Sequence, residues 1–139
     1  MKFTARIITG RGRGKRIGTP TINLALEDVP EDLEEGIYAC WVTSTKYEIR
    51  NTRFKSKAVM HYGPRPVFKD SASCEIHLLD EPIDLSDGTL EIEVIERMRD
   101  VQNFPSPEEL IAQIKADIAL SREILMKKEA DREKWRMDS

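Results

Sequence analysis

The sequence is poor in cysteine, in aromatic residues and in long apolar runs. Its 139 residues include two cysteines, and only 6% of them are aromatic. Both cysteines, Cys40 and Cys74, lie in apolar stretches, where free thiols behave as small hydrophobic side chains. No apolar run approaches the ~18 residues of a membrane-spanning helix, and segment 1–10 lacks the apolar core of a secretory signal. These absences favour a single cytoplasmic domain with no membrane segment.

A regular alternation of strand and helix patterns is also missing, which excludes a doubly wound parallel sheet. Stretches that alternate apolar and polar side chains, as half-buried strands do, occupy most of the chain instead. We predict strands at Lys2–Ile8, Thr21–Leu26, Ile37–Thr43, Lys46–Arg50, Thr52–Tyr62, Ala72–Asp80 and Thr89–Met98. The expected fold is mainly β, an antiparallel sheet or small closed barrel of about six strands with a long C-terminal helix packed outside.

The predicted helix begins at a capping box. Ser106 and Glu109 can satisfy free backbone N–H groups at a helix start, and Pro107 suits the first helical position. An apolar stripe with helical spacing follows, formed by Leu110, Ile111, Ile114, Ile118 and Leu125. The stripe ends near Met126. We therefore divide the chain into a barrel domain with its helix, residues 1–126, and a charged helical extension or tail, residues 127–139.

The net charge of −3 conceals a strong asymmetry along the chain. Residues 1–26 contain six lysines or arginines and no acid, whereas residues 27–35 contain six acids. The basic segment suits phosphate anions, and the acidic run is typical of a solvated connection. The total charge does not indicate general attraction to nucleic acid.

The stretch Gly10–Leu24 reads GRGRGKRIGTPTINL and differs from the rest of the chain. Four glycines and four basic residues suit a loop whose backbone N–H groups surround phosphate oxygens. The stretch is not a Walker A loop, because Arg16 follows Lys15 where that motif requires Ser or Thr. Strand alternation places the Thr21 hydroxyl beside the Asn23 amide, two neutral oxygens of the kind that Mg²⁺ shares with phosphates. A basic turn that binds nothing is an equally good interpretation of the composition.

The predicted strand Ala72–Asp80 carries a carboxylate and an imidazole on its polar face. Glu75 and His77 are two residues apart, so both can reach one reacting group as proton acceptors. Exposed strands also carry such residues without any chemical role. The strand alone therefore leaves both interpretations open.

Three ordered motifs resemble those of the riboflavin kinases, over residues from about Ala5 to Leu125. The first is the glycine-rich stretch, which ends in the family's G-x-P-T-x-N pattern, and the third is the E-x-H of Glu75. The second lies in His61–Phe68, which we expect to be a loop because it holds two prolines and a glycine. Gly63, Pro66 and Phe68 match the family pattern N-I-G-x-x-P-T-F there, and His61, Tyr62 and Val67 depart from it.

The resemblance implies a role for each matching residue. Glu75 takes the position of the catalytic base, and Thr21 and Asn23 take those of the magnesium ligands. The residues implied to bind the ATP phosphates are Gly10, Gly12, Gly14, Lys15, Gly18, Pro20, Thr21 and Asn23. The segment RDVQNF matches the family segment that lies against the flavin, through Arg99, Asn103 and Phe104.

The resemblance also implies a Greek-key barrel and a function. The expected enzyme transfers the γ-phosphoryl of Mg-ATP to the ribityl 5′-hydroxyl of riboflavin, which gives FMN and ADP. Its expected partners are small molecules, with no nucleic acid, and the expected state is a monomer. Many bacterial relatives carry an adenylyltransferase domain before the kinase, for which 139 residues leave no room. Two alternatives remain: a small barrel that binds nucleic acid, and a flavin-binding domain without catalysis.

Overall fold

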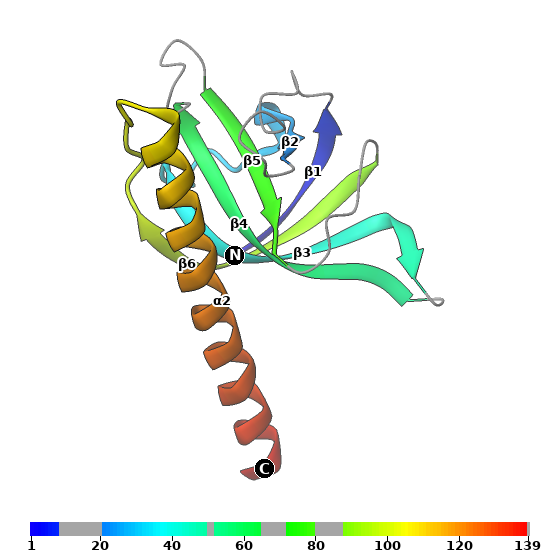
Figure 1. Ribbon diagram of the computed structural model, residues 1–139. Helices are drawn as coiled ribbons and strands as arrows, with labels where there is room; N and C mark the ends of the chain where they lie inside the picture. The colour runs from blue at the N-terminus through cyan, green and yellow to red at the C-terminus, as the bar shows by residue number, and fades with distance from the viewer. Residues whose placement is uncertain (9–20, 50–51, 65–71, 80–87, 139) are drawn as a thin grey trace.

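Six antiparallel strands and one long helix make up the described part of the chain, residues 1–8, 21–49, 52–64, 72–79 and 88–138 of a computed structural model (Figure 1). The strands close into a barrel, and the helix lies outside it. The elements are β1 (Lys2–Ile8), β2 (Ile22–Leu24), the short 3-10 helix η1 (Leu26–Asp28), β3 (Gly36–Ile49), β4 (Thr52–Pro64), β5 (Ala72–Leu78), β6 (Thr89–Arg99) and α2 (Pro107–Asp138).

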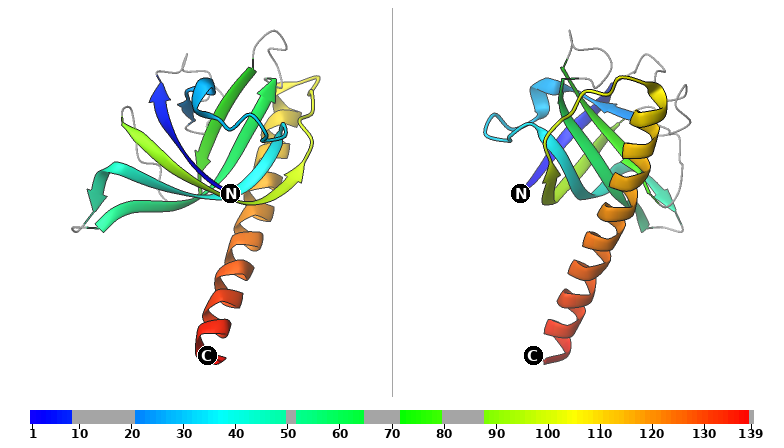
Figure 2. Two further views of the ribbon diagram at one scale, coloured as in Figure 1. Left: turned by 180° about the vertical axis from the view of Figure 1, so that it is seen from behind. Right: turned by 60° about the vertical axis from the view of Figure 1, so that its left-hand side comes forward.

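The barrel has the strand order β1-β2-β5-β4-β3-β6, and all neighbouring strands are antiparallel. Strands β3, β4 and β5 form a meander, and β6 returns to lie beside β3, which is the Greek-key arrangement. The first strand, β1, closes the barrel between β2 and β6, as the view from behind shows (Figure 2). The predicted fold class is therefore confirmed.

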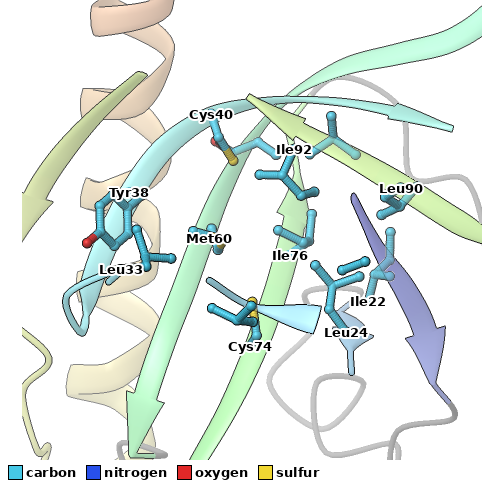
Figure 3. Close-up of a cluster of buried hydrophobic side chains, with 14 of the residues drawn as sticks. Ile22, Leu24, Leu33, Tyr38, Cys40, Met60, Cys74, Ile76, Leu90 and Ile92 are labelled. Atoms are coloured by element: carbon cyan, nitrogen blue, oxygen red, sulfur yellow. The ribbon is translucent and has the colours of Figure 1, made fainter. Parts of the chain in front are cut away.

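Strand alternation builds the interior of the barrel. Ile22 and Leu24 of β2 lie beside their partners on β5, Ile76 and Cys74, and all four side chains are in the core with Met60 of β4 (Figure 3). Each of these side chains is at most 7% exposed. Their neighbours in sequence must point to the outer surface of the wall, because successive residues of a strand alternate between its two faces.

A second buried layer lies between the outer surface of β3 and β4 and the helix α2. Ala39 and Val59 are buried, but the residues before and after each of them form the barrel core. These two side chains therefore point out of the barrel. The helix places Leu110 and Leu125 in the same layer and contacts both strands. Ser121, also buried, donates a hydrogen bond from its Oγ to the Ala58 carbonyl at 3.2 Å. One wall of the barrel is thus covered on both sides.

Three expected element boundaries are wrong. The segment predicted as the loop His61–Phe68 begins inside a strand, because β4 continues to Pro64; residues 65–68 lie outside the described part. Lys46–Arg50 is not a separate strand, since β3 runs on to Ile49. This segment forms a hairpin with β4, in which Ile49 is paired to Thr52.

The third correction concerns the strand expected at Thr21–Leu26, which is shorter. It ends at Leu24, where Ala25 leads into η1. Ala25 is buried and Leu26 is 42% exposed, the reverse of the alternation that the sequence predicted.

The helix α2 starts at the predicted capping box and continues without a break to Asp138. Ser106 Oγ accepts a hydrogen bond from the Glu109 N–H at 3.3 Å. The C-terminal part projects beyond the barrel in Figure 1, and two ion pairs connect it to the wall. These join Glu129 to Lys57 at 3.7 Å and Arg132 to Glu93 at 3.6 Å. None of the helices in the described part of the chain has the length and apolar character needed to cross a bilayer.

Candidate active site

The pairing of β2 with β5 brings two of the predicted functional residues together. Asn23 lies directly opposite Glu75 in the antiparallel register. Both alternate with core residues, so both side chains stand on the outer surface of the wall, where each is half-buried. Directly opposed residues of antiparallel strands have Cβ atoms about 4.5–5.5 Å apart. An amide and a carboxylate far apart in sequence therefore share one small area.

The remaining phosphate-binding candidates divide into two groups. Thr21 is half-buried and immediately precedes β2, two positions before Asn23. The candidates that lie outside the described residues are Gly10, Gly12, Gly14, Lys15, Gly18 and Pro20. The described part of this site is thus the Thr21–Asn23–Glu75 group.

His61 extends the row to a third strand. The register of β4 with β5 places His61 opposite Glu75, on the side away from Asn23. The imidazole is 6% exposed. The sequence did not reveal this neighbour, because the prolines and the glycine that follow His61 suggested a loop.

His77 is not on an exposed face, although it alternates with Glu75 on β5. Its side chain is 7% exposed, and its Nδ1 has no hydrogen-bond partner among the described residues. Burial, with a smaller contribution from His61, lowers the pKa of His77 to about 4, against a weaker opposite effect of Asp117. The imidazole is therefore neutral near pH 7, and it is more deeply buried than the half-buried Glu75, so Glu75 is the more accessible of the two groups.

The flavin candidates lie where β6 ends and the chain turns into α2. Arg99 is the last residue of β6, and its guanidinium lies over the Phe104 ring, 6.0 Å from the ring centroid. Asn103 is exposed in the same connection. Arg99 Nε and Nη2 donate to Oδ1 and Oδ2 of Asp117 at 2.9 and 2.7 Å. Asp117 comes from the helix and was not among the predicted site residues.

The helix sequence did contain a sign of Asp117's role, but it was a polar residue on a face that was expected to be apolar. We expected an apolar stripe to mark the face of α2 that meets the barrel. The buried face instead includes Asp117 and Ser121 between Leu110 and Leu125, at steps of four or seven residues. Polar residues at such spacing, inside an otherwise apolar face, indicate partners on the surface that the helix covers.

The oxygen donors in this area are compatible with a magnesium–phosphate complex. Within the described residues, no group of three or more His, Cys, Asp or Glu side chains could hold a metal ion. Mg²⁺ usually takes only one or two protein oxygens and completes its shell with phosphates and water. The amide oxygen of Asn23, with the hydroxyl of Thr21 close by in sequence, fits that requirement.

Comparison with known proteins agrees with this geometry. The family model described as "Flavokinase: Riboflavin kinase" matches residues 1–125. This chain belongs to the riboflavin kinase family. The riboflavin kinase of Yarrowia lipolytica is 30% identical to it, over 96% of this chain and 84% of the relative. The predicted family resemblance is thereby confirmed.

Two further riboflavin kinase relatives differ in length and in similarity. The bifunctional riboflavin kinase/FMN adenylyltransferase of Pseudomonas fluorescens is 30% identical, and the match covers 87% of this chain but 37% of that protein. The crystal structure of riboflavin kinase from Trypanosoma brucei superposes with a TM-score of 0.58 at 20% identity, over 92% of this chain and 82% of that one. At that identity the structural match supports the fold alone.

Proposed function

We propose that this chain transfers the γ-phosphoryl of Mg-ATP to the ribityl 5′-hydroxyl of riboflavin, with Glu75 as the catalytic base. Membership of the family supports riboflavin kinase activity with ATP and riboflavin as substrates. The observation that carries the residue assignment is the register of β2 with β5, which puts Asn23 opposite Glu75. A ligand for the magnesium ion on the ATP phosphates and a proton acceptor are then within reach of one transferred phosphoryl group.

The reaction requires positioning and a place for one proton. A bond forms between the riboflavin 5′-oxygen and the γ-phosphorus as the bond from that phosphorus to the β-phosphate oxygen breaks. The 5′-hydroxyl proton passes to the Glu75 carboxylate, and ADP leaves. Mg²⁺, when bound, supplies charge neutralisation to the phosphate oxygens, and the oxygens of Thr21 and Asn23 are the groups we assign to hold it.

The two substrates bind different segments of the chain in the proposal. The ATP phosphates bind the glycine-rich loop through its backbone N–H groups and Lys15. The flavin binds the connection between β6 and α2, against Arg99, Asn103 and Phe104. The cation–ring contact of Arg99 with Phe104 gives this connection a flat, polarisable surface of the kind that aromatic rings stack on.

A product assay tests the proposed activity. We expect purified protein, incubated with riboflavin and Mg-ATP, to form FMN and ADP in equal amounts when the flavins are separated by chromatography. Riboflavin fluorescence quenching without any FMN would instead indicate the flavin-binding domain without catalysis. Retention on single-stranded nucleic acid, with neither flavin binding nor turnover, would indicate the nucleic-acid module, which the family match does not favour.

The metal assignment predicts a changed magnesium requirement. Thr21→Val removes one oxygen at constant volume, and Asn23→Leu does the same for the amide. We expect each variant to need a higher magnesium concentration for half-maximal rate and to turn over more slowly, with little change in unfolding temperature. Magnesium titrations that match the wild type in both variants would show that the two side chains are structural.

We also propose that the enzyme acts as a monomer in the cytoplasm, without nucleic acid. In the described barrel every strand pairs with a neighbour on both sides over part of its length, so the closed ring itself offers no open sheet edge to a second copy. Cys40 and Cys74 are both free and buried, which suits a reducing compartment. The acidic net charge of −3 does not favour a polyanionic partner.

A further inference from the structure

The contact between Arg99 and Asp117 joins the proposed flavin segment to the helix. Both carboxylate oxygens of Asp117 accept from Arg99, at 2.9 and 2.7 Å, in a bidentate pair. The side chains are 20% and 7% exposed, so the pair is largely shielded from water. A bidentate arginine–carboxylate pair fixes the plane of the guanidinium as well as its position.

A second residue of α2 holds the carboxylate itself. Gln113, one turn before Asp117, donates from its Nε2 to Asp117 Oδ1 at 3.0 Å. Arg99 Nη1 donates to the Asp100 carbonyl at 2.9 Å, so a third contact limits rotation of the guanidinium. The helix therefore sets the orientation of a side chain that belongs to the end of β6.

The geometry of these bonds leaves part of the guanidinium available. Arginine has five N–H groups, and Asp117 takes those of one edge, on Nε and Nη2. With one Nη1 hydrogen on Asp100, one N–H on Nη1 and one on Nη2 donate to none of the described residues. Asp117 also cancels the positive charge of Arg99. The pair thus presents two donors without a net charge, which suits the carbonyl oxygens of a neutral flavin ring better than a phosphate.

We propose that Asp117 is a positioning residue for riboflavin: it orients and neutralises Arg99 so that the guanidinium donates to the neutral ring. This inference rests on the proposed function, because Arg99 contacts the flavin only in that proposal. It makes the helix α2 part of the flavin site, although none of the predicted site residues belongs to it. The effect is on substrate binding and not on the transferred phosphoryl group.

Asp117→Asn tests the proposal, with riboflavin fluorescence quenching and steady-state kinetics as separate readouts. The change keeps the volume and removes the charge and one acceptor. We expect the riboflavin Kd and KM to rise roughly tenfold, as for the loss of one charge-assisted hydrogen bond. The ATP KM and kcat should stay near wild type. Asp131→Asn, the same substitution at an exposed position of α2, is the matched control and should change neither.

A double-variant comparison separates positioning from a merely structural role. In an Arg99→Met background, Asp117→Asn should change the riboflavin Kd by no more than about twofold. Effects of mutations at independent sites are additive to within about this factor. An equal loss with and without the guanidinium would overturn the proposal, as would a wild-type Kd in the single variant. If Asp117→Asn does not fold, Gln113→Leu provides the test, because it keeps the ion pair but removes the hydrogen bond that holds the carboxylate. This variant should also raise the riboflavin Kd. An unchanged Kd would overturn the proposal.

The two proposals fail in distinguishable ways. A wild-type protein that binds riboflavin but forms no FMN contradicts the proposed function, and the Kd comparison still decides the role of Asp117. A wild-type protein that does not bind riboflavin contradicts both. Normal FMN formation with an unaltered Asp117→Asn variant contradicts the role of Asp117 alone.

Discussion

Glu75→Gln is expected to lower kcat by roughly 10²–10⁴-fold, the usual contribution of a general base. The glutamine keeps the size of the side chain and can still form hydrogen bonds, but it cannot take the proton from the riboflavin 5′-hydroxyl. A hydroxyl is a poor nucleophile until that proton is accepted. Riboflavin and ATP should bind as before, because the lost basicity affects only the transition state. Single-turnover rates and separate binding titrations measure the two effects.

Two controls accompany this variant. Glu91→Gln makes the same change on the outer surface of β6, away from the site, and should leave kcat unaltered. His77→Asn should cost much less turnover than Glu75→Gln, since His77 is buried and already neutral. The assignment to Glu75 fails if the glutamine variant turns over normally, and it moves to His77 if the histidine variant is the more severe.

Acid should destabilise the fold through His77, by about 3 kcal/mol once both states are fully protonated. Its pKa is about 4 in the folded protein and 6.5 in the unfolded chain, a difference that corresponds to about 1.4 kcal/mol per pH unit. Above pH 6.5 the imidazole is neutral in both states and has no effect. As the pH falls from 6.5 to 4, only the unfolded chain gains the proton, so the stability is lost over that window and the loss is complete below pH 4.

Urea unfolding at pH 7.5 and pH 5.0 checks this prediction. The wild type should lose about 2 kcal/mol more than His77→Gln between the two pH values, because the glutamine does not titrate. The comparison cancels the contributions of other groups. Two of these, His61 and Asp117, face His77 from β4 and from α2. Equal pH dependence in the two proteins would show that His77 does not resist protonation in the fold.

Short-range pattern was sufficient to predict much of the barrel. The alternation in Lys2–Ile8 and Thr89–Met98 gave two strands almost as they are, because one face of each strand meets the core and the other meets water. The same reasoning failed at His61–Pro64. A glycine and a proline usually end a strand, but Pro64 is the last residue of β4, where a missing N–H costs little. Gly63 has a φ of +139°, which glycine tolerates and other residues rarely adopt.

The site was predictable in its parts but not in its assembly. Asn23 and Glu75 were identified from local sequence and from the family motifs. Their opposition across β2 and β5 depends on long-range register, which no local pattern specifies. Asp117 was missed for a related reason: a charged residue on a helix normally faces water, and only the surface opposite it, with Arg99, explains its burial.

The position of β1 has a consequence for how the enzyme is made. Of the six described strands this one is synthesised first, yet Lys2–Arg6 pair with Thr89–Glu93 of β6. Its other neighbour, β2, has three residues and is too short to hold a ladder alone. Closure therefore waits for nearly the whole barrel to be synthesised, and such non-local pairing is intrinsically slow. Because Asn23, the proposed magnesium ligand, lies on β2 between β1 and β5, we expect activity to appear only after the ring has closed.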